Sequence, residues 1–194
     1  MHKKMVWLAV LALALPFTAF ATSIDISNAG GTLTGSASGI ALTGSTMFKF
    51  DTIVGTNLGS VSFTTGAFTS GDAQNGGTLA AGGTFTITGN GSMGVPNGVI
   101  FSGTFSNATW TMETLSDGTH NYILNGALVA PNGQVGATTQ ISVNTGMSLF
   151  SGSAKLSSGD TNLNQLAVPE PGTLSLLGTG LIGLAGILRK RGLS

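Results

Sequence analysis

The residues best suited to chemistry in the central part of the chain are one histidine and two carboxylates within a short segment. They are Glu113, Asp117 and His120. Imidazole and carboxylate groups can bind a metal ion or share a proton. However, Asp117 precedes Gly118, and Asp-Gly is a hairpin turn signal that would place Glu113 and His120 on opposing strands. The favoured interpretation is a solvated hairpin tip with an acid–histidine pair. A metal site is a weaker alternative and a catalytic role the weakest, and we expect no bound metal and no cofactor.

Other catalytic patterns are missing from the sequence. The chain contains no cysteine, which excludes disulfides, thiolate metal sites and cysteine nucleophiles. It has no G-x-S-x-G motif, and no pair of carboxylates has the setting of a glycosidase site. We therefore expect that the protein is not an enzyme.

Two aromatic residues next to the same turn are candidates for ligand binding. Trp110 and Tyr122 would face each other across the Asp117-Gly118 hairpin, close to His120. On an exposed sheet face the two rings could stack on a sugar. The favoured alternative is a core tryptophan, with the tyrosine keeping its hydroxyl near the edge of the core.

The elements that would position these residues are strands. Residues 22–166 show period-two alternation and almost no helical pattern; in residues 84–88, for example, Phe85 and Ile87 alternate with threonines. About ten short strands separated by Gly, Asn and Asp turns favour an all-β fold, an antiparallel β-sandwich or jelly-roll-like domain. A β-solenoid is disfavoured because no fixed repeat occurs. Residues 22–31 and 157–168 are expected to be flexible, the second as a tether.

Charge limits the class of partner. Charged residues make up 7% of the chain, against roughly 25% in ordinary soluble proteins. Residues 22–168 carry two lysines against six carboxylates, a net charge of −4. Without a basic patch, nucleic acid is not an expected partner.

The N-terminus has the pattern of a secretory signal peptide at residues 1–21. A positive start with Lys3 and Lys4 precedes an apolar run at 5–15. Ala19 and Ala21 then supply the small-x-small pattern that signal peptidase accepts, so we expect cleavage after Ala21. The alternative, a permanent anchor, is disfavoured because the run is short for a membrane span.

The C-terminus, residues 168–194, combines three features in order. Pro169, Glu170 and Pro171 precede an apolar stretch at 172–188, which is followed by the basic cluster Arg189, Lys190 and Arg191. The apolar stretch is just long enough for a transmembrane helix, and the basic cluster would hold its end in the cytoplasm. Residues 22–167 would then form the exported domain.

This tail resembles the PEP-CTERM sorting signal, so the chain is similar to PEP-CTERM domain proteins. The resemblance implies recognition by an exosortase, with processing near Pro169-Glu170-Pro171 after a membrane-anchored stage. A hydrophobic tail would thus be read and removed, as in GPI anchoring. The alternative is a plain C-terminal anchor that stays in place.

We expect an exported protein of the cell envelope or extracellular matrix, at the cell surface or released after processing. Its role would be structural, in association with exopolysaccharide or biofilm. A carbohydrate-binding or adhesion module that uses residues such as Trp110 is the alternative, and a hydrolase centred on His120 is the least favoured.

Overall fold

The computed structural model describes residues 22–131 and 135–165. The predicted signal peptide, the Pro-Glu-Pro motif, the transmembrane helix and the basic cluster lie outside the described residues. None of the described residues forms a helix long and apolar enough to cross a membrane. The elements are β1 (Thr22–Ala29), β2 (Thr32–Ser36), β3 (Gly39–Phe50), β4 (Ile53–Thr64), β5 (Phe68–Asp72), β6 (Gly76–Leu79), β7 (Gly82–Asn90), the 3₁₀ turn η1 (Ser92–Gly94), β8 (Asn97–Thr114), β9 (His120–Val129), β10 (Val135–Asn144), β11 (Ser153–Lys155) and β12 (Ser158–Gln165).

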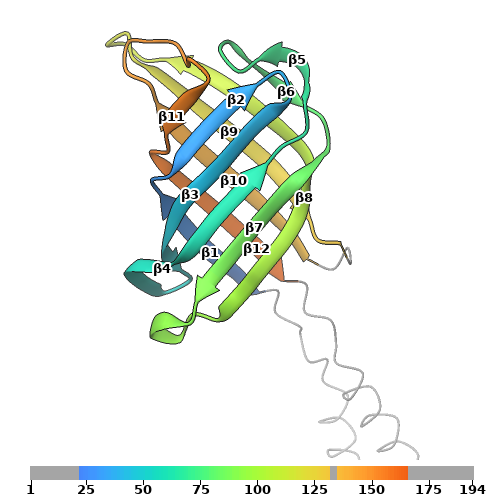
Figure 1. The fold of residues 1–194 in the computed structure, drawn as a ribbon, viewed down its shortest axis with the longest axis vertical. Helices are drawn as coiled ribbons and strands as arrows, with labels where there is room; N and C mark the ends of the chain where they lie inside the picture. The colour runs from blue at the N-terminus through green and yellow to red at the C-terminus, as the bar shows by residue number, and fades with distance from the viewer. Residues whose placement is uncertain (1–21, 132–134, 166–194) are drawn as a thin grey trace, which may run out of the picture. The chain divides into compact units, whose positions relative to one another are not determined.

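Eight of these strands close into an antiparallel barrel (Figure 1). The order around the ring is β1-β12-β10-β9-β8-β7-β4-β3, and β3 returns to β1. The all-β, antiparallel prediction is confirmed, but the β-sandwich or jelly-roll prediction is wrong, because one sheet curls round until its ends pair. Closure depends on the 12-residue strand β3, whose second half pairs with β1 while its first half pairs with β2. Closing the ring leaves its eight strands without a free edge.

The short strands extend one end of the barrel (Figure 1). There β2 continues the sheet beside β3, and β11 pairs with β2. The hairpin of β5 and β6 attaches to β8 through three residue pairs, Gly77–Trp110 to Leu79–Ala108. This hairpin therefore lies beside the strand that carries Trp110.

The expectation of flexibility at residues 22–31 and 157–168 is corrected where these segments form strands, at residues 22–29 and 158–165, whereas residues 166–168 lie outside the described residues. Most of each segment lies in β1 or β12, and these strands pair along seven residues, from Thr22–Gln165 to Asn28–Gly159. Ile26 and Leu163 are buried in the core. The polar composition of these segments suggested flexibility. The expectation failed because each segment also pairs with a strand more than a hundred residues away, which no local pattern indicates.

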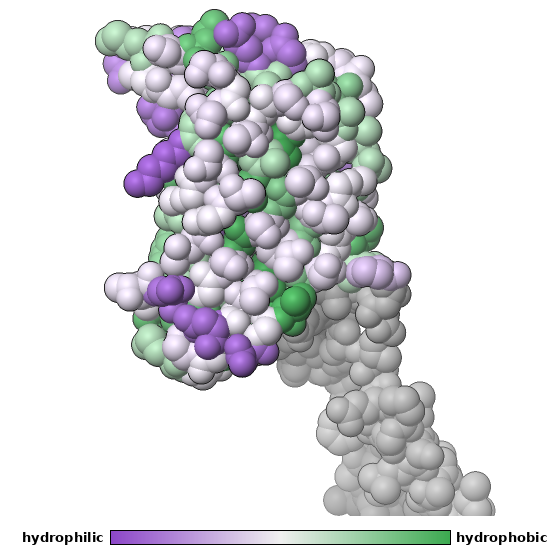
Figure 2. All heavy atoms as spheres, viewed as in Figure 1, coloured by the Kyte–Doolittle hydropathy of each residue, from purple (hydrophilic) through white to green (hydrophobic). Residues whose placement is uncertain are grey.

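The barrel interior is filled by the apolar members of the alternating pattern. Phe63 and Phe85 stack with centroids 5.8 Å apart, and Phe105 meets both edge-on at 5.7 and 5.9 Å. All three rings are buried. The outer positions carry mainly Thr, Ser and Gly, seen as the pale surface of Figure 2. Each strand thus has an apolar inner face and a largely uncharged polar outer face.

Candidate functional site

The turn between β8 and β9 is built by Asp117. Its Oδ1 accepts hydrogen bonds from the Thr119 backbone N–H at 3.0 Å and from the Thr119 hydroxyl at 2.7 Å. These bonds favour the charged carboxylate and hold the pKa of Asp117 below its usual range. Gly118 has a φ of 81°, a conformation that a residue with a Cβ rarely adopts. The predicted hairpin is confirmed, and the carboxylate of Asp117 is used to close it.

His120 bonds a threonine instead of a carboxylate. Its Nδ1 lies 3.1 Å from the Thr114 hydroxyl, and its backbone N–H donates to the Gly146 carbonyl at 2.7 Å. The predicted acid–histidine pair is wrong, because the register places Thr114 opposite His120 while Glu113 pairs with Asn121 and faces the other way. No group of three or more His, Asp or Glu residues within the described ranges could hold a metal ion.

Trp110 and Tyr122 meet inside the barrel. Their rings stack at 5.3 Å, and Phe150 packs edge-on against Trp110 at 5.7 Å. Only 1% of Trp110 and none of Tyr122 is exposed. The structure therefore agrees with the prediction of a core tryptophan, and neither ring offers a free face on which a sugar could stack.

The polar atoms of these two rings anchor the loop between β5 and β6. Trp110 Nε1 donates to the Ala73 carbonyl at 2.8 Å, and the Tyr122 hydroxyl donates to the Gln74 carbonyl at 2.7 Å. The same hydroxyl accepts from the Phe150 backbone N–H at 3.0 Å. The polar side-chain atoms of these two buried rings therefore both have hydrogen-bond partners, as burial requires.

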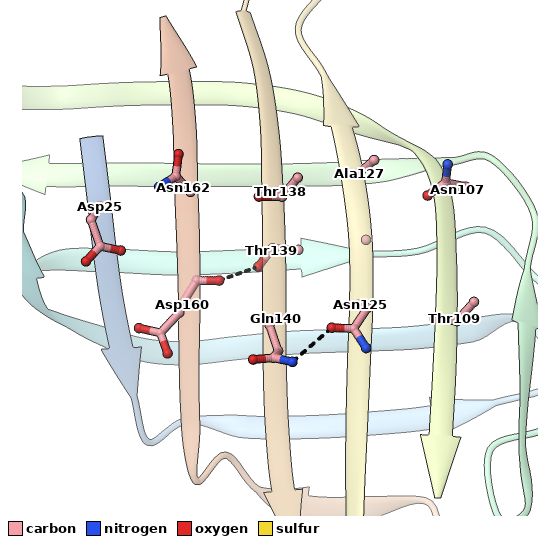
Figure 3. A pocket seen from close by; sticks show the side chains of 11 residues that line it. Asp25, Asn107, Thr109, Asn125, Ala127, Thr138, Thr139, Gln140, Asp160 and Asn162 are labelled. Carbon is pink, nitrogen blue, oxygen red and sulfur yellow. Dashed lines mark hydrogen bonds between the residues drawn. The ribbon is translucent and has the colours of Figure 1, made fainter. Parts of the chain in front are cut away.

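A groove of about 530 Å³ lies on the outer face of the barrel, across β1, β12, β10, β9 and β8 (Figure 3). The polar side chains around it are amides, carboxylates and hydroxyls, none of them basic. Its lining residues are Asp25, Asn107, Thr109, Asn125, Gly126, Ala127, Thr138, Thr139, Gln140, Asp160 and Asn162. Ten of these are labelled in Figure 3, and most occupy outward positions that alternate with core residues.

Strand register arranges the outward side chains in two rows. One row runs from Asp25 through Asn162, Thr138 and Ala127 to Asn107. The other runs from Asp160 through Gln140 and Asn125 to Thr109. In the second row the Gln140 amide Nε2 donates to Asn125 Oδ1 at 3.1 Å, shown as a dashed line in Figure 3.

The floor of the groove is low because the central outward residue is small. Ala127 projects only a methyl group, and Gly126 beside it lines the groove with its backbone, because its side-chain position faces the core. A Cβ on Gly126 would lie 2.6 Å from Cε1 of the buried Phe105 ring, so the core requires glycine there. The pairing of β8 with β9 also shifts register between Phe105 and Asn107, and such bulges bend a strand.

One ion pair borders the groove. Lys49 Nζ lies 2.5 Å from Asp25 Oδ2, and the hydrogen bond and attraction to Asp25 raise the pKa of Lys49. Asp160 accepts a hydrogen bond from the Ser27 hydroxyl at 2.7 Å. Since these side chains are solvent-accessible, their charges are screened.

Sequence reasoning missed this groove. The alternation of residues 135–144 marks Thr138 and Gln140 as outward-facing, so that part was readable. The order of the strands was not, because β12 lies between β1 and β10 and joins the two ends of the domain. No local signal indicates such a pairing.

The comparisons with known proteins concern the C-terminal tail. Residues 167–191 match the family described as PEP-CTERM protein-sorting motif, a range that includes Pro169, Glu170 and Pro171 and the basic cluster. No curated protein and no solved structure matches the chain significantly. The chain therefore carries the PEP-CTERM protein-sorting motif, which marks it as an exported, cell-surface-sorted substrate of an exosortase.

Proposed function

We propose that this exosortase substrate is a structural, non-catalytic component of the cell envelope or extracellular matrix, associated with exopolysaccharide or biofilm. The observation that carries the proposal is the position of the motif. It begins at residue 167, two residues after the last described strand of a closed barrel with a largely uncharged outer face. A sorting system would thus deliver a barrel whose surface has the hydrogen-bonding character of a glycan.

The non-catalytic role is supported by what the candidate catalytic groups do. The Asp117 carboxylate closes a turn, and the His120 ring bonds Thr114. Trp110 and Tyr122 pack in the core and hold a loop through their polar atoms. These groups are used in building the fold, so a hydrolase remains the least favoured function.

The proposed route has two processing steps. Signal peptidase would cleave after Ala21, and the apolar stretch 172–188 would then hold the protein in the membrane. Exosortase would process the chain near Pro169-Glu170-Pro171, leaving the barrel on the cell surface or in the medium. A specific carbohydrate-binding module is a second candidate function. The observation that favours it is the amide-lined groove, because the aromatic pair is buried and cannot contact a sugar.

The first test is the intact mass of the protein recovered from envelope and medium fractions of its host. We expect loss of the first 21 residues and of the tail beyond Pro169-Glu170-Pro171. Two matched variants sharpen the test. Glu170→Ala should block processing at the motif, whereas Glu113→Ala, which removes an exposed acid on β8, should leave processing unchanged. A protein that retains its tail through Ser194 in wild type would contradict the proposal.

Association with polysaccharide is tested in the same fractions. In a host strain that lacks exopolysaccharide synthesis, the processed protein should move from the matrix fraction into the medium. An unchanged distribution would show that the protein is held by something other than the polysaccharide.

A further inference from the structure

We propose that the outer groove binds a neutral polysaccharide whose ring hydroxyls are held by Asn125, Gln140 and Asp160. This role deepens the proposed function and rests on it, because a protein of a polysaccharide matrix must contact the polymer that surrounds it. It replaces the buried Trp110 and Tyr122 as the place where carbohydrate would bind.

The chemistry of the lining matches sugar hydroxyls. A carboxamide offers both a donor and an acceptor, so it can bond two adjacent hydroxyls, and a carboxylate accepts from hydroxyls strongly. Asn125, Gln140 and Asp160 are all exposed on the outer face. The Gln140–Asn125 hydrogen bond of 3.1 Å holds two of these groups in fixed relation before a ligand arrives.

The spacing of the groups matches an extended glycan. Neighbouring strands lie about 4.8 Å apart, which is comparable with the length of one pyranose unit. A chain lying across the strands would meet Asp160, Gln140, Asn125 and Thr109 in turn, one for each sugar. The short side chain of Ala127 leaves room for the apolar face of a ring.

Charge selects a neutral polymer. The groove contains the carboxylates of Asp25 and Asp160 and no basic side chain, and the neighbouring Lys49 is paired with Asp25. A polyanion would bring its charges next to the Asp160 carboxylate and would find no basic side chain in the lining to pair with. A polymer held by hydroxyl groups meets no such penalty.

The test is affinity electrophoresis of the processed protein recovered from its host, in native gels that contain dextran, mannan or hydroxyethylcellulose. Alginate serves as the polyanionic comparison. We expect at least one neutral polysaccharide to retard the protein. The double substitution Asn125→Ala with Gln140→Ala should weaken that retardation about tenfold, the effect of losing one to two net hydrogen bonds.

The matched control is the double substitution Asn121→Ala with Asn144→Ala. These amides lie on β9 and β10 like Asn125 and Gln140, and they are joined by a similar hydrogen bond of 3.3 Å. They do not line the groove, so binding should be unchanged. Thermal melting verifies that the variants are folded, and the single substitution Gln140→Ala replaces the double variant if that one unfolds.

Three results would overturn the groove assignment. They are the absence of retardation by every neutral polysaccharide, equal losses in the two double variants, and retardation by alginate alone. Binding to a neutral polymer should also persist when salt is raised, although the screening length falls from about 10 Å at 0.1 M to about 3 Å at 1 M. Processed protein in the matrix that fails these gels would refute the groove and leave the proposed function standing. A tail that is not processed would refute the proposed function, and polysaccharide binding by the groove would still be decided by the affinity electrophoresis.

Discussion

The two faces of β8, β9 and β10 differ in what their polar groups do. On the inner face the Trp110 Nε1 and the Tyr122 hydroxyl each bond a backbone carbonyl, and both rings are buried. On the outer face, at alternate positions of the same strands, Asn125 and Gln140 are open to solvent. The inner groups therefore hold the fold, whereas the outer groups are free to exchange water for a ligand. Substitutions on the two faces should separate stability from binding.

The largest effect is expected from Trp110→Ala on the inner face. Removing a fully buried indole leaves a cavity beside Tyr122 and Phe150, and such truncations cost about 3–5 kcal/mol. Urea unfolding of the processed protein would measure the loss as a lower midpoint. A change within about 0.5 kcal/mol would place Trp110 at the surface and break the comparison.

Tyr122→Phe should come next. The ring stays, but the Gln74 carbonyl and the Phe150 backbone N–H lose their shared partner inside the barrel. Leaving buried polar groups unsatisfied costs about 2–3 kcal/mol. The same unfolding experiment measures it, with Tyr122→Leu as a control that also disrupts the ring packing and should cost more.

Gly126→Ala tests the position that serves both faces. The new Cβ would lie 2.6 Å from Phe105 Cε1. Removing a glycine stabilises the fold by lowering the entropy of the unfolded chain, but the overpacking costs more, so we expect a net loss of about 1 kcal/mol in stability. Gly136→Ala on β10 is the matched control, since its Cβ would come no closer than 4.0 Å to the Leu128 carbonyl. Equal unfolding midpoints for the two variants would contradict the close contact with Phe105.

The turn carboxylate makes a smaller, pH-dependent contribution. The pKa of Asp117 is lowered from 3.8 in the folded state, so its stabilisation is present above pH 3.8 and is lost as pH falls through the folded value. Asp117→Ala should therefore melt below wild type at neutral pH, and the gap should close in acid. Ser116→Ala in the same turn is the control, because serine carries no titrating group and the difference in melting temperature from wild type should not change with pH. A difference for Asp117→Ala that is likewise independent of pH would refute the role of the charge.

The smallest effect on stability is expected from Asn125→Ala with Gln140→Ala on the outer face. Exposed substitutions usually stay within about 0.5 kcal/mol, so urea unfolding should hardly change. A loss as large as that of Tyr122→Phe would show that the amides support the fold, and the contrast between the two faces would fail.

Much of the local structure was readable from the residues. The Asp117-Gly118 turn was predicted because an Asp side chain bonds backbone two residues on, and the structure has that bond to Thr119. The pairing of His120 with Thr114 was missed because it depends on register to within one residue. The strands at residues 22–29 and 158–165 were missed because one partner of each is the strand at the other end of the domain.

The sequence alone determined the sorting motif, the all-β class and the hairpin tip, because each is encoded in neighbouring residues or in a period of two. The tertiary structure decided the closure of the barrel, the burial of Trp110 and Tyr122, and the groove. These depend on contacts between distant segments, such as Ser27 with Asp160, 133 positions apart. Alternation shows which residues share a face, but only the closed ring shows which strands stand side by side and which face is buried.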